Sequence, residues 1–225
     1  MPSTNVNGDS PPTEAIRVVI VDDHDTVAYG LRALIEDELG IDVVAIVGSA
    51  AEAIAVAERL RPDVMLVDYR LPDGTGSDAA RAIRSLASPP AIVMITADAD
   101  RRVLAQALNA GCSGFVSKHA DRDDIVASIR AAAADDSYFT RDVLKHLAHL
   151  RRFDQVDAVE LGEREIEVLQ LTADGLSPDA IATLLFLSPH TVKNHLRHAM
   201  SKLDAHSKLD AVVKAVRARL ISIDR

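Results

Sequence analysis

The sequence is poor in residue types on which many binding sites depend. Among 225 residues there is one cysteine, Cys112, so the chain has no internal disulfide and no metal site made from a cysteine cluster. Tryptophan is absent, and aromatic residues make up 3% of the chain. This scarcity argues against an aromatic stacking platform for single-stranded nucleic acid.

Long apolar runs are also missing. A membrane-spanning helix needs roughly 18 or more consecutive apolar residues, and the sequence has no such run. The N-terminal residues lack the pattern of a signal peptide. We therefore expect a soluble, cytoplasmic protein with no membrane association. A hydrophobic content of 48% is enough for a sizeable core, and the length is typical of one or two domains.

The net charge of −9 is unevenly distributed. Residues 1–135 carry 12 Lys and Arg against 21 Asp and Glu, whereas residues 136–225 carry 13 of each kind. Within the second part, residues 188–225 carry 8 basic and 3 acidic residues, together with four histidines. This asymmetry indicates two domains with different partners. A basic end is consistent with binding to nucleic acid, but also with a solvated helix face.

Residues 15–135 predict an α/β domain. Short β-branched runs alternate with stretches of helical periodicity, which favours a parallel sheet covered by helices on both faces. In the first helix, Leu31, Leu34, Ile35 and Leu39 fall at core spacing. Five such units predict a five-stranded, flavodoxin-like (βα)5 sheet. The strands are expected over 17–21, 43–47, 64–67, 91–95 and 114–116, and the helices over 26–39, 49–60, 77–86, 100–110 and 122–134.

The remaining residues predict a tail, a linker and a helical domain. Residues 1–14 are polar and proline-rich, which is typical of a disordered tail. We assign 136–158 to a linker that contains a helix over about 141–152, and 159–225 to an all-α domain of four short helices. Ser177–Pro178 and Ser188–Pro189 each combine a capping residue with a proline at the first helical position.

Polar residues follow four of the predicted strands. Asp22 and Asp23 follow the first strand and Asp68 the third, while Thr96 and Lys118 follow the fourth and fifth. The carboxyl ends of parallel strands form one rim, where ligands bind in open α/β sheets. Three carboxylates would repel one another there, and a divalent cation such as Mg²⁺ resolves the repulsion. Lys118 adds a charge suited to a phosphoryl group. Taken singly, each residue is better explained as a solvated strand-end acid or a loop lysine, and only the set as a whole favours a Mg²⁺ and phosphoryl site.

The same stretch resembles the receiver domain of two-component response regulators. The motifs VVIVDDH, DVMLVDYRLPDGTG, MITA and GFVSK occur in that family's order across residues 16–134. One departure is His119, which stands where many receivers have proline. The resemblance implies Asp68 as phosphoacceptor, Asp22, Asp23 and the backbone carbonyl of Arg70 as further ligands of Mg²⁺ or Mn²⁺, Thr96 and Lys118 as ligands of the phosphoryl oxygens, and Phe115 as an aromatic switch.

Two positions in this stretch have a simpler interpretation beside the functional one. Without the resemblance, Phe115 is as readily an ordinary core aromatic. His24 follows the acidic pair directly, and we interpret it as a surface or loop histidine rather than a carrier of phosphate.

The second informative stretch is LSPHTVKNHLRHAMSKL, residues 187–203. One helical stripe of it is apolar and is expected to pack inward. The opposite face carries basic and amide side chains that can reach base edges in a major groove, and the preceding helix and turn complete a helix-turn-helix. The stripe comprises Val192, Leu196, Ala199, Met200 and Leu203, and the polar face comprises His190, Lys193, Asn194, Arg197 and Ser201.

Residues 161–221 resemble the DNA-binding domain of the NarL/FixJ (LuxR-type) regulators. The segments EREIEVLQL, DGLS, IATLL and LSPHTVKNH carry the match. By this resemblance Lys193, Asn194 and Arg197 read bases. Phosphate contacts are assigned to Thr191, Ser188 and either Lys202 or Lys208. The sequence departs from the usual pattern at Gly162, Ala180, Ala199 and Lys208.

Together the two stretches predict a transcription factor controlled by phosphorylation and not an enzyme. A sensor histidine kinase would phosphorylate Asp68, and a homodimer would then bind double-stranded DNA at two half-sites. RNA polymerase is left open as a further partner. One rival is a Mg²⁺-dependent phosphohydrolase with an aspartyl-phosphate intermediate, although its usual second carboxylate is here Arg70. Another rival is a regulator that binds DNA without phosphorylation.

Overall fold

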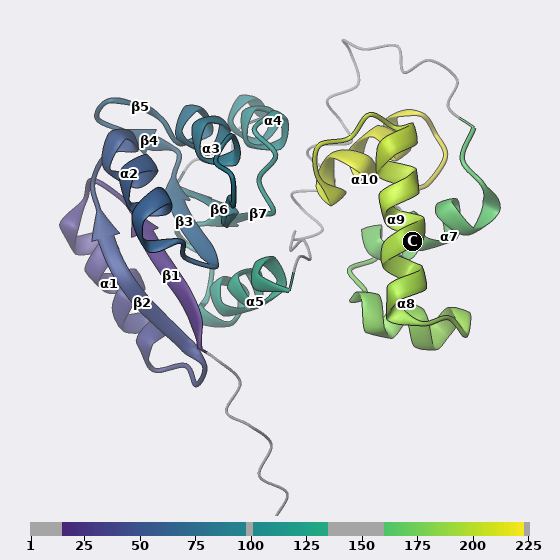
Figure 1. Ribbon diagram of the computed structural model, residues 1–225, viewed down its shortest axis with the longest axis horizontal. Coiled ribbons are helices and arrows are strands. Elements are labelled where there is room, and N and C mark those ends of the chain that lie inside the picture. The colour runs from purple at the N-terminus through teal and green to yellow at the C-terminus, as the bar shows by residue number, and fades with distance from the viewer. Residues whose placement is uncertain (1–14, 98–100, 135–159, 223–225) are drawn as a thin grey trace, which may run out of the picture.

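The computed structural model describes residues 15–97, 101–134 and 160–222, and Figure 1 shows an α/β domain beside a helical domain. The predicted tail at 1–14 and the linker helix at 141–152 lie outside the described residues. Within the described part of the chain, no helix is both long and apolar enough to cross a membrane.

Five parallel strands form the central sheet, as the sequence predicts. Their order is β2-β1-β3-β6-β7, so the ends of β1, β3 and β6 are neighbours at one rim. A two-residue antiparallel ribbon, β4 with β5, follows β3 and was not predicted. The strands are β1 (Ile16–Val21), β2 (Ile41–Val47), β3 (Val64–Asp68), β4 (Arg70–Leu71), β5 (Gly74–Thr75), β6 (Ala91–Thr96) and β7 (Gly114–Ser117).

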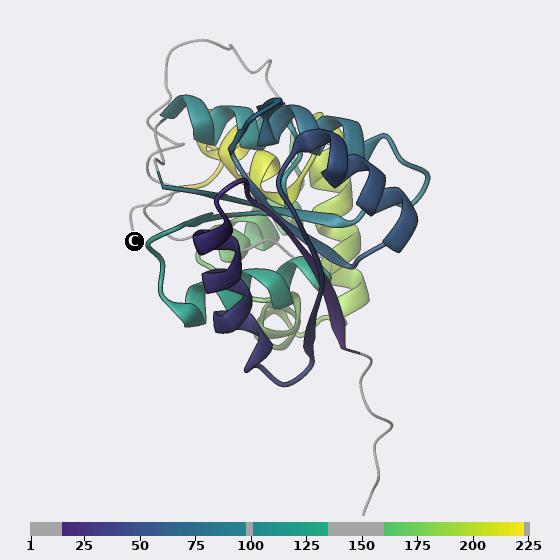
Figure 2. The ribbon, with the colours of Figure 1, turned by 90° about the vertical axis from the view of Figure 1, so that its left-hand side faces the viewer.

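Helices cover both faces of this sheet (Figure 2). The side chains of β1 alternate between the two layers, because successive residues in a strand point to opposite faces. Val18 and Ile20 lie in the apolar cluster with α1 and α5, whereas Val19 and Val21 lie in the cluster with α2, α3 and α4. The helices are α1 (Asp25–Glu36), α2 (Ala50–Leu60), α3 (Gly76–Arg84), α4 (Arg101–Asn109) and α5 (Arg122–Ala133).

The first helix is shorter than its periodicity predicts. It ends at Glu36, and Gly40, with φ of +83°, turns the chain into β2. Leu39 therefore lies outside the helix and is 93% exposed, while Leu34 is 41% exposed. The expectation that both leucines pack in the core is wrong, whereas Leu31 and Ile35 are buried as expected.

The helical domain contains α7 (Glu163–Ala173), α8 (Pro178–Leu185), α9 (Pro189–Lys202) and α10 (Lys208–Arg217). The two predicted caps are present: Ser177 Oγ accepts a hydrogen bond from Ala180 N at 3.3 Å, and Ser188 Oγ accepts one from Thr191 N at 3.1 Å. The apolar stripe of α9 packs inward, since Val192, Leu196 and Ala199 are at most 4% exposed. These features place α8 and α9 as a helix-turn-helix.

Candidate functional site

The sheet brings together the polar residues that the sequence places after its strands. Asp22 and Thr96 are 2% exposed and Asp68 is 3% exposed. Lys118 Nζ lies 2.6 Å from Asp22 Oδ2 and 2.8 Å from Asp68 Oδ2. One ammonium group thus bridges two buried carboxylates that are 46 residues apart in the sequence.

Backbone hydrogen bonds hold these strand ends in position. Asp22 N donates to Val47 O at 3.0 Å, and Lys118 N donates to Thr96 O at 2.8 Å. Tyr69 N, just after Asp68, donates to the Ile95 carbonyl at 3.0 Å. Because strand pairing continues up to the site, the carboxylates are fixed to the rigid sheet and not to a loop.

The second acid of the pair lies at the outer edge of the site. The Asp23 side chain is 33% exposed, and its Oδ1 lies 2.7 Å from His24 Nδ1. His24 N also donates to Asp22 Oδ1 at 3.0 Å. Ligand atoms of Asp22, Asp23, His24 and Asp68 lie within 4.8 Å of one another. Such a cluster of carboxylates offers the oxygen ligands that divalent cations such as Mg²⁺ prefer.

Burial and charge act in opposite directions on this cluster. Burial raises the pKa of the Asp68 carboxyl above its ordinary value, although the Lys118 ammonium opposes the rise. Burial alone would lower the pKa of Lys118, but its hydrogen bonds to the Asp22 and Asp68 carboxylates outweigh this and raise the pKa. Lys118 therefore stays charged and offsets part of the negative charge of the site.

A cavity of about 280 Å³ opens beside Asp68. It gives space for a phosphoryl group and a cation next to the Asp68 carboxylate. Arg70, whose backbone carbonyl is predicted to bind the metal ion, lies on its wall. The lining residues are His24, Val27, Asp68, Arg70, Thr96, Ala97 and Lys118.

Phe115 is an interior residue. It is 2% exposed, pairs in register with Met94 across the sheet, and lies in the same buried cluster as Leu104 and Leu108 of α4. Both interpretations made from the sequence, a switch and an ordinary core aromatic, place the ring in the interior.

Two contacts near the phosphoacceptor candidate were missed. The Tyr69 hydroxyl donates to Gln106 Oε1, which links the residue after Asp68 to α4. The Asp73 carboxylate accepts hydrogen bonds from Ala50 N at 2.8 Å and Ala51 N at 3.0 Å, and these bonds lower the pKa of Asp73. Neither partner is near in sequence, so only the fold reveals the pairing.

Gly76 is a further residue that the site requires. A methyl group at this position would overlap the backbone carbonyl oxygen of Asp68 and press on the Met94 sulfur. We expect Gly76→Ala to lower the free energy of unfolding by about 2 kcal/mol or more, because the backbone of Asp68 would have to shift. Urea denaturation measures the effect. Gly74→Ala is the matched control, since that site has open space; equal losses would contradict the steric explanation.

The predicted DNA-reading face lies along α9. Lys193 and Arg197 are exposed, and Asn194 is half-buried. Arg197 Nη1 donates to Asn194 Oδ1 at 2.9 Å, so these two side chains are oriented together. The Ser188 and Thr191 hydroxyl oxygens lie 2.8 Å apart at the start of the helix. In this arrangement Lys193, Arg197 and Lys208 line a cavity shared with the α/β domain.

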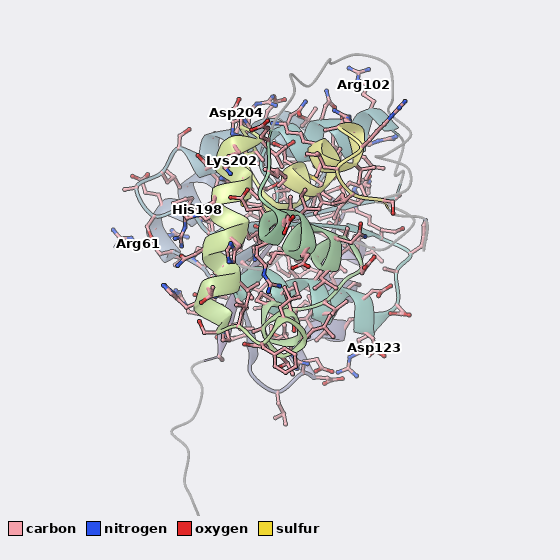
Figure 3. All side chains as sticks on the ribbon, turned by 90° about the vertical axis from the view of Figure 1, so that its right-hand side faces the viewer. Arg61, Arg102, Asp123, His198, Lys202 and Asp204 are labelled. Carbon is pink, nitrogen blue, oxygen red and sulfur yellow. The ribbon has the colours of Figure 1, made fainter. Side chains whose placement is uncertain are left out.

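Lys202 has a partner within its own domain. Its Nζ lies 2.9 Å from Glu165 Oε2, and Glu165 also accepts a hydrogen bond from Gly162 N at 2.7 Å. Glycine has no side chain to complete a capping box, so Glu165 alone caps the start of α7. Figure 3 shows Lys202 and His198 along α9, with Asp204 beyond its end. The sequence does not predict this contact, which engages Lys202 with a carboxylate of its own domain.

The Glu165 contact predicts a pH effect on stability. Burial raises the pKa of the Glu165 carboxyl, but the bonds from Lys202 and Gly162 outweigh it and the pKa falls below its ordinary value. A carboxyl with a lowered folded pKa stabilises above its unfolded pKa, and the contribution disappears as the pH falls through the folded value. Glu165→Gln should therefore cost about 1 kcal/mol at neutral pH and little in acid. Urea denaturation across the acid range measures this, and an equal cost at every pH would refute it.

Known protein families match both halves of the chain. Residues 18–130 match the family described as response regulator receiver domain. Residues 159–215 match the family described as bacterial regulatory proteins, luxR family.

Similar proteins extend the match to nearly the whole chain. The nitrate/nitrite response regulator protein NarP of Escherichia coli is 34% identical over 93% of this chain and 98% of its own length. The probable transcriptional regulatory protein NarL of Mycobacterium tuberculosis is 33% identical over 94% and 99%. The crystal structure of ChrA, the response regulator of a heme-sensing two-component system, is 29% identical, with a TM-score of 0.54 over 93% of this chain and 100% of that one.

Proposed function

We propose that phosphorylation of Asp68 controls DNA binding by α9. The chain belongs to the NarL-type family of two-component response regulators, and proteins of this family combine a receiver domain with a LuxR-type DNA-binding domain. The family consists of regulators of transcription and not of enzymes. We take 15–135 as the receiver, 136–158 as the linker and 159–225 as the DNA-binding domain.

The observation that carries this proposal is the position of Lys118. Its ammonium group bridges Asp22 and Asp68 at the rim of the sheet, beside a cavity of about 280 Å³. The positive charge of the Lys118 ammonium offsets the repulsion between the two buried carboxylates. The same arrangement can accept a metal ion and a phosphoryl group.

The donor set of the rim fits Mg²⁺ or Mn²⁺. Carboxylates of Asp22, Asp23 and Asp68 converge, and Arg70 lies on the wall of the same cavity, where its backbone carbonyl could serve as a further oxygen ligand. When bound, the ion neutralises negative charge between the carboxylate and the incoming phosphoryl group. His24 contacts Asp23 at the outer edge and orients it.

Asp68 is the nucleophile because it is the buried carboxylate that faces the cavity. One of its oxygens forms the bond to phosphorus as the donor's leaving group departs. Lys118 and Thr96 line the same cavity, and the Lys118 ammonium and the Thr96 hydroxyl would bind the phosphoryl oxygens. For this, Lys118 gives up its contact with Asp22, and the end of β7 shifts with it. Phe115, which lies in β7 three residues before Lys118, would be the side chain through which this shift reaches the buried cluster with α4.

The output of the switch is access to α9. Lys193 and Arg197 are exposed, but they line a cavity together with receiver residues, so in this arrangement the receiver would obstruct the approach of a DNA duplex to them. Phosphorylation by a sensor histidine kinase in the cytoplasm would favour separation of the domains and a homodimer that binds two half-sites. Lys193, Asn194 and Arg197 would read bases, whereas Ser188, Thr191 and Lys208 would contact phosphates. Contact with RNA polymerase is a further step that the same dimer allows.

Selection of bound sequences from a random pool of DNA tests the whole proposal. The full-length protein is used with and without a small phosphodonor and Mg²⁺. We expect the phosphodonor to enrich one motif that contains two related half-sites. Enrichment of the same motif to the same degree without phosphodonor would refute control by phosphorylation, and absence of any motif under both conditions would refute the DNA-reading role of α9.

A further inference from the structure

A second cavity, of about 260 Å³, lies between the receiver and the DNA-binding domain. Arg84, at the end of α3, lines it from the receiver side together with Gly111 and Ser113. Lys193 and Arg197 of α9 line it from the other side. His206 and Ser207, which precede α10, and Lys208, its first residue, complete the wall.

The cavity wall is rich in basic side chains. Arg84, Lys193, Arg197 and Lys208 line it beside the apolar Leu196 and Met200, and among the described residues that line the cavity none is acidic. Like charges gathered between two domains oppose domain closure. At the acidic rim the charges are reversed, and there the Lys118 ammonium reduces the repulsion between the Asp22 and Asp68 carboxylates. An anion would reduce the repulsion between the basic side chains of this cavity in the same way.

Arg84 and Arg197 donate hydrogen bonds to neutral oxygens, which leave the positive charge of the two guanidinium groups in place. Arg84 Nη1 donates to Gly111 O at 2.9 Å, and Arg84 Nη2 donates to His206 O at 3.4 Å, so this arginine joins the two domains through carbonyl groups. Arg197 Nη1 likewise donates to the amide oxygen of Asn194. The nearby Asp210 carboxylate is occupied by His206 N and Lys214 Nζ, each at 3.0 Å.

The donors suit a small phosphorylated anion. Arginine binds phosphate oxygens with two parallel N–H groups, and lysine adds a compact charge. Helix α10 begins at Lys208, next to the cavity, so the positive end of its dipole reinforces the attraction. A volume of about 260 Å³ admits phosphate, pyrophosphate or a small phosphorylated metabolite, but not a nucleic acid duplex.

We propose that this interdomain cavity binds a small phosphorylated anion, which bridges Arg84 of the receiver to Lys193, Arg197 and Lys208 and holds the domains together. The ligand binds the closed arrangement and not the open one, so it opposes DNA binding by linkage. This inference goes beyond control through Asp68 and rests on the proposed role of Lys193 and Arg197 in DNA binding only for its effect on DNA. At ten times its Kd, such an anion would weaken apparent DNA affinity about tenfold.

Direct binding tests the site without DNA or phosphorylation. Inorganic pyrophosphate is titrated into the full-length protein by calorimetry, in Mg²⁺-free buffer at constant ionic strength, so that the acidic rim cannot take up the probe. Arg84→Gln removes the receiver's contribution. Arg81→Gln is the matched control, because Arg81 lies on the same helix, pairs with Asp78 and does not line the cavity.

We expect pyrophosphate to bind the wild type and Arg81→Gln equally, and Arg84→Gln about tenfold or more weakly, as for loss of a charge-assisted hydrogen bond. Equal affinity for all three proteins, or no binding, would overturn the site.

A DNA arm tests the consequence separately. At constant ionic strength, pyrophosphate should weaken DNA binding by the unphosphorylated wild type and by Arg81→Gln, but much less by Arg84→Gln. Equal weakening in all three proteins would mean that the anion merely competes with DNA phosphates, and would refute the bridging role. Binding with no change in DNA affinity would refute the linkage while leaving control through Asp68 untouched.

Discussion

Replacing Asp68 with asparagine should abolish Mg²⁺-dependent labelling of the protein by a small phosphodonor. Asp68 is 3% exposed, and its carboxylate lies beside a cavity of about 280 Å³ and is paired with Lys118 at 2.8 Å. Asparagine keeps the shape and the backbone contacts of the strand end but lacks the nucleophilic oxygen. Intact-protein mass spectrometry measures the addition of one phosphoryl group per chain, and we expect complete loss of that species.

A matched substitution separates chemistry from a general loss of charge. Asp42→Asn removes an exposed carboxylate from β2 of the same domain and should leave labelling unchanged. Labelling of Asp68→Asn at the wild-type level would show that another residue is the acceptor. Loss of labelling with no change in DNA affinity would instead support the rival in which DNA binding is independent of phosphorylation.

The sequence was sufficient to predict which polar residues meet at the rim, because the order of the parallel strands determines which strand ends are neighbours. Asp68 and Thr96 end neighbouring parallel strands and Asp22 directly follows the strand beside them, so predicting the strands also predicted that these side chains lie close together. The sequence predicts that Lys118 binds a phosphoryl group. It does not predict that the Lys118 ammonium bridges the carboxylates of Asp22 and Asp68, as the structure shows.

Other features could not be predicted because they depend on contacts between distant segments. Arg84 looks like an ordinary basic residue in the last turn of α3, and its contact with His206 joins residues 122 positions apart. The Lys202 contact with Glu165 depends on the crossing of α7 and α9. Leu39 was wrongly predicted for a different reason. The apolar periodicity of the sequence continues to Leu39, but the helix ends at Glu36.

Arg197→Ala should reduce discrimination between DNA sequences about tenfold to a hundredfold, because a side chain that donates to base edges distinguishes bases by about 1–3 kcal/mol. Lys208→Ala should weaken binding to all sequences alike and lower the slope of log affinity against log salt by about one, because it removes one phosphate contact. Fluorescence anisotropy with the selected motif and a scrambled duplex, in the presence of phosphodonor and Mg²⁺, measures both quantities.

Both residues also line the interdomain cavity, so either substitution changes how readily the domains separate. A change in that equilibrium multiplies the affinity for every sequence by the same factor and cancels in the ratio of two affinities. The ratio therefore isolates base reading by Arg197 from release of α9. Arg164→Ala is the control, since Arg164 lies on α7 and pairs with Glu167 at 2.7 Å. An equal loss of discrimination in the Arg197 and Lys208 variants would contradict the division between base and phosphate contacts.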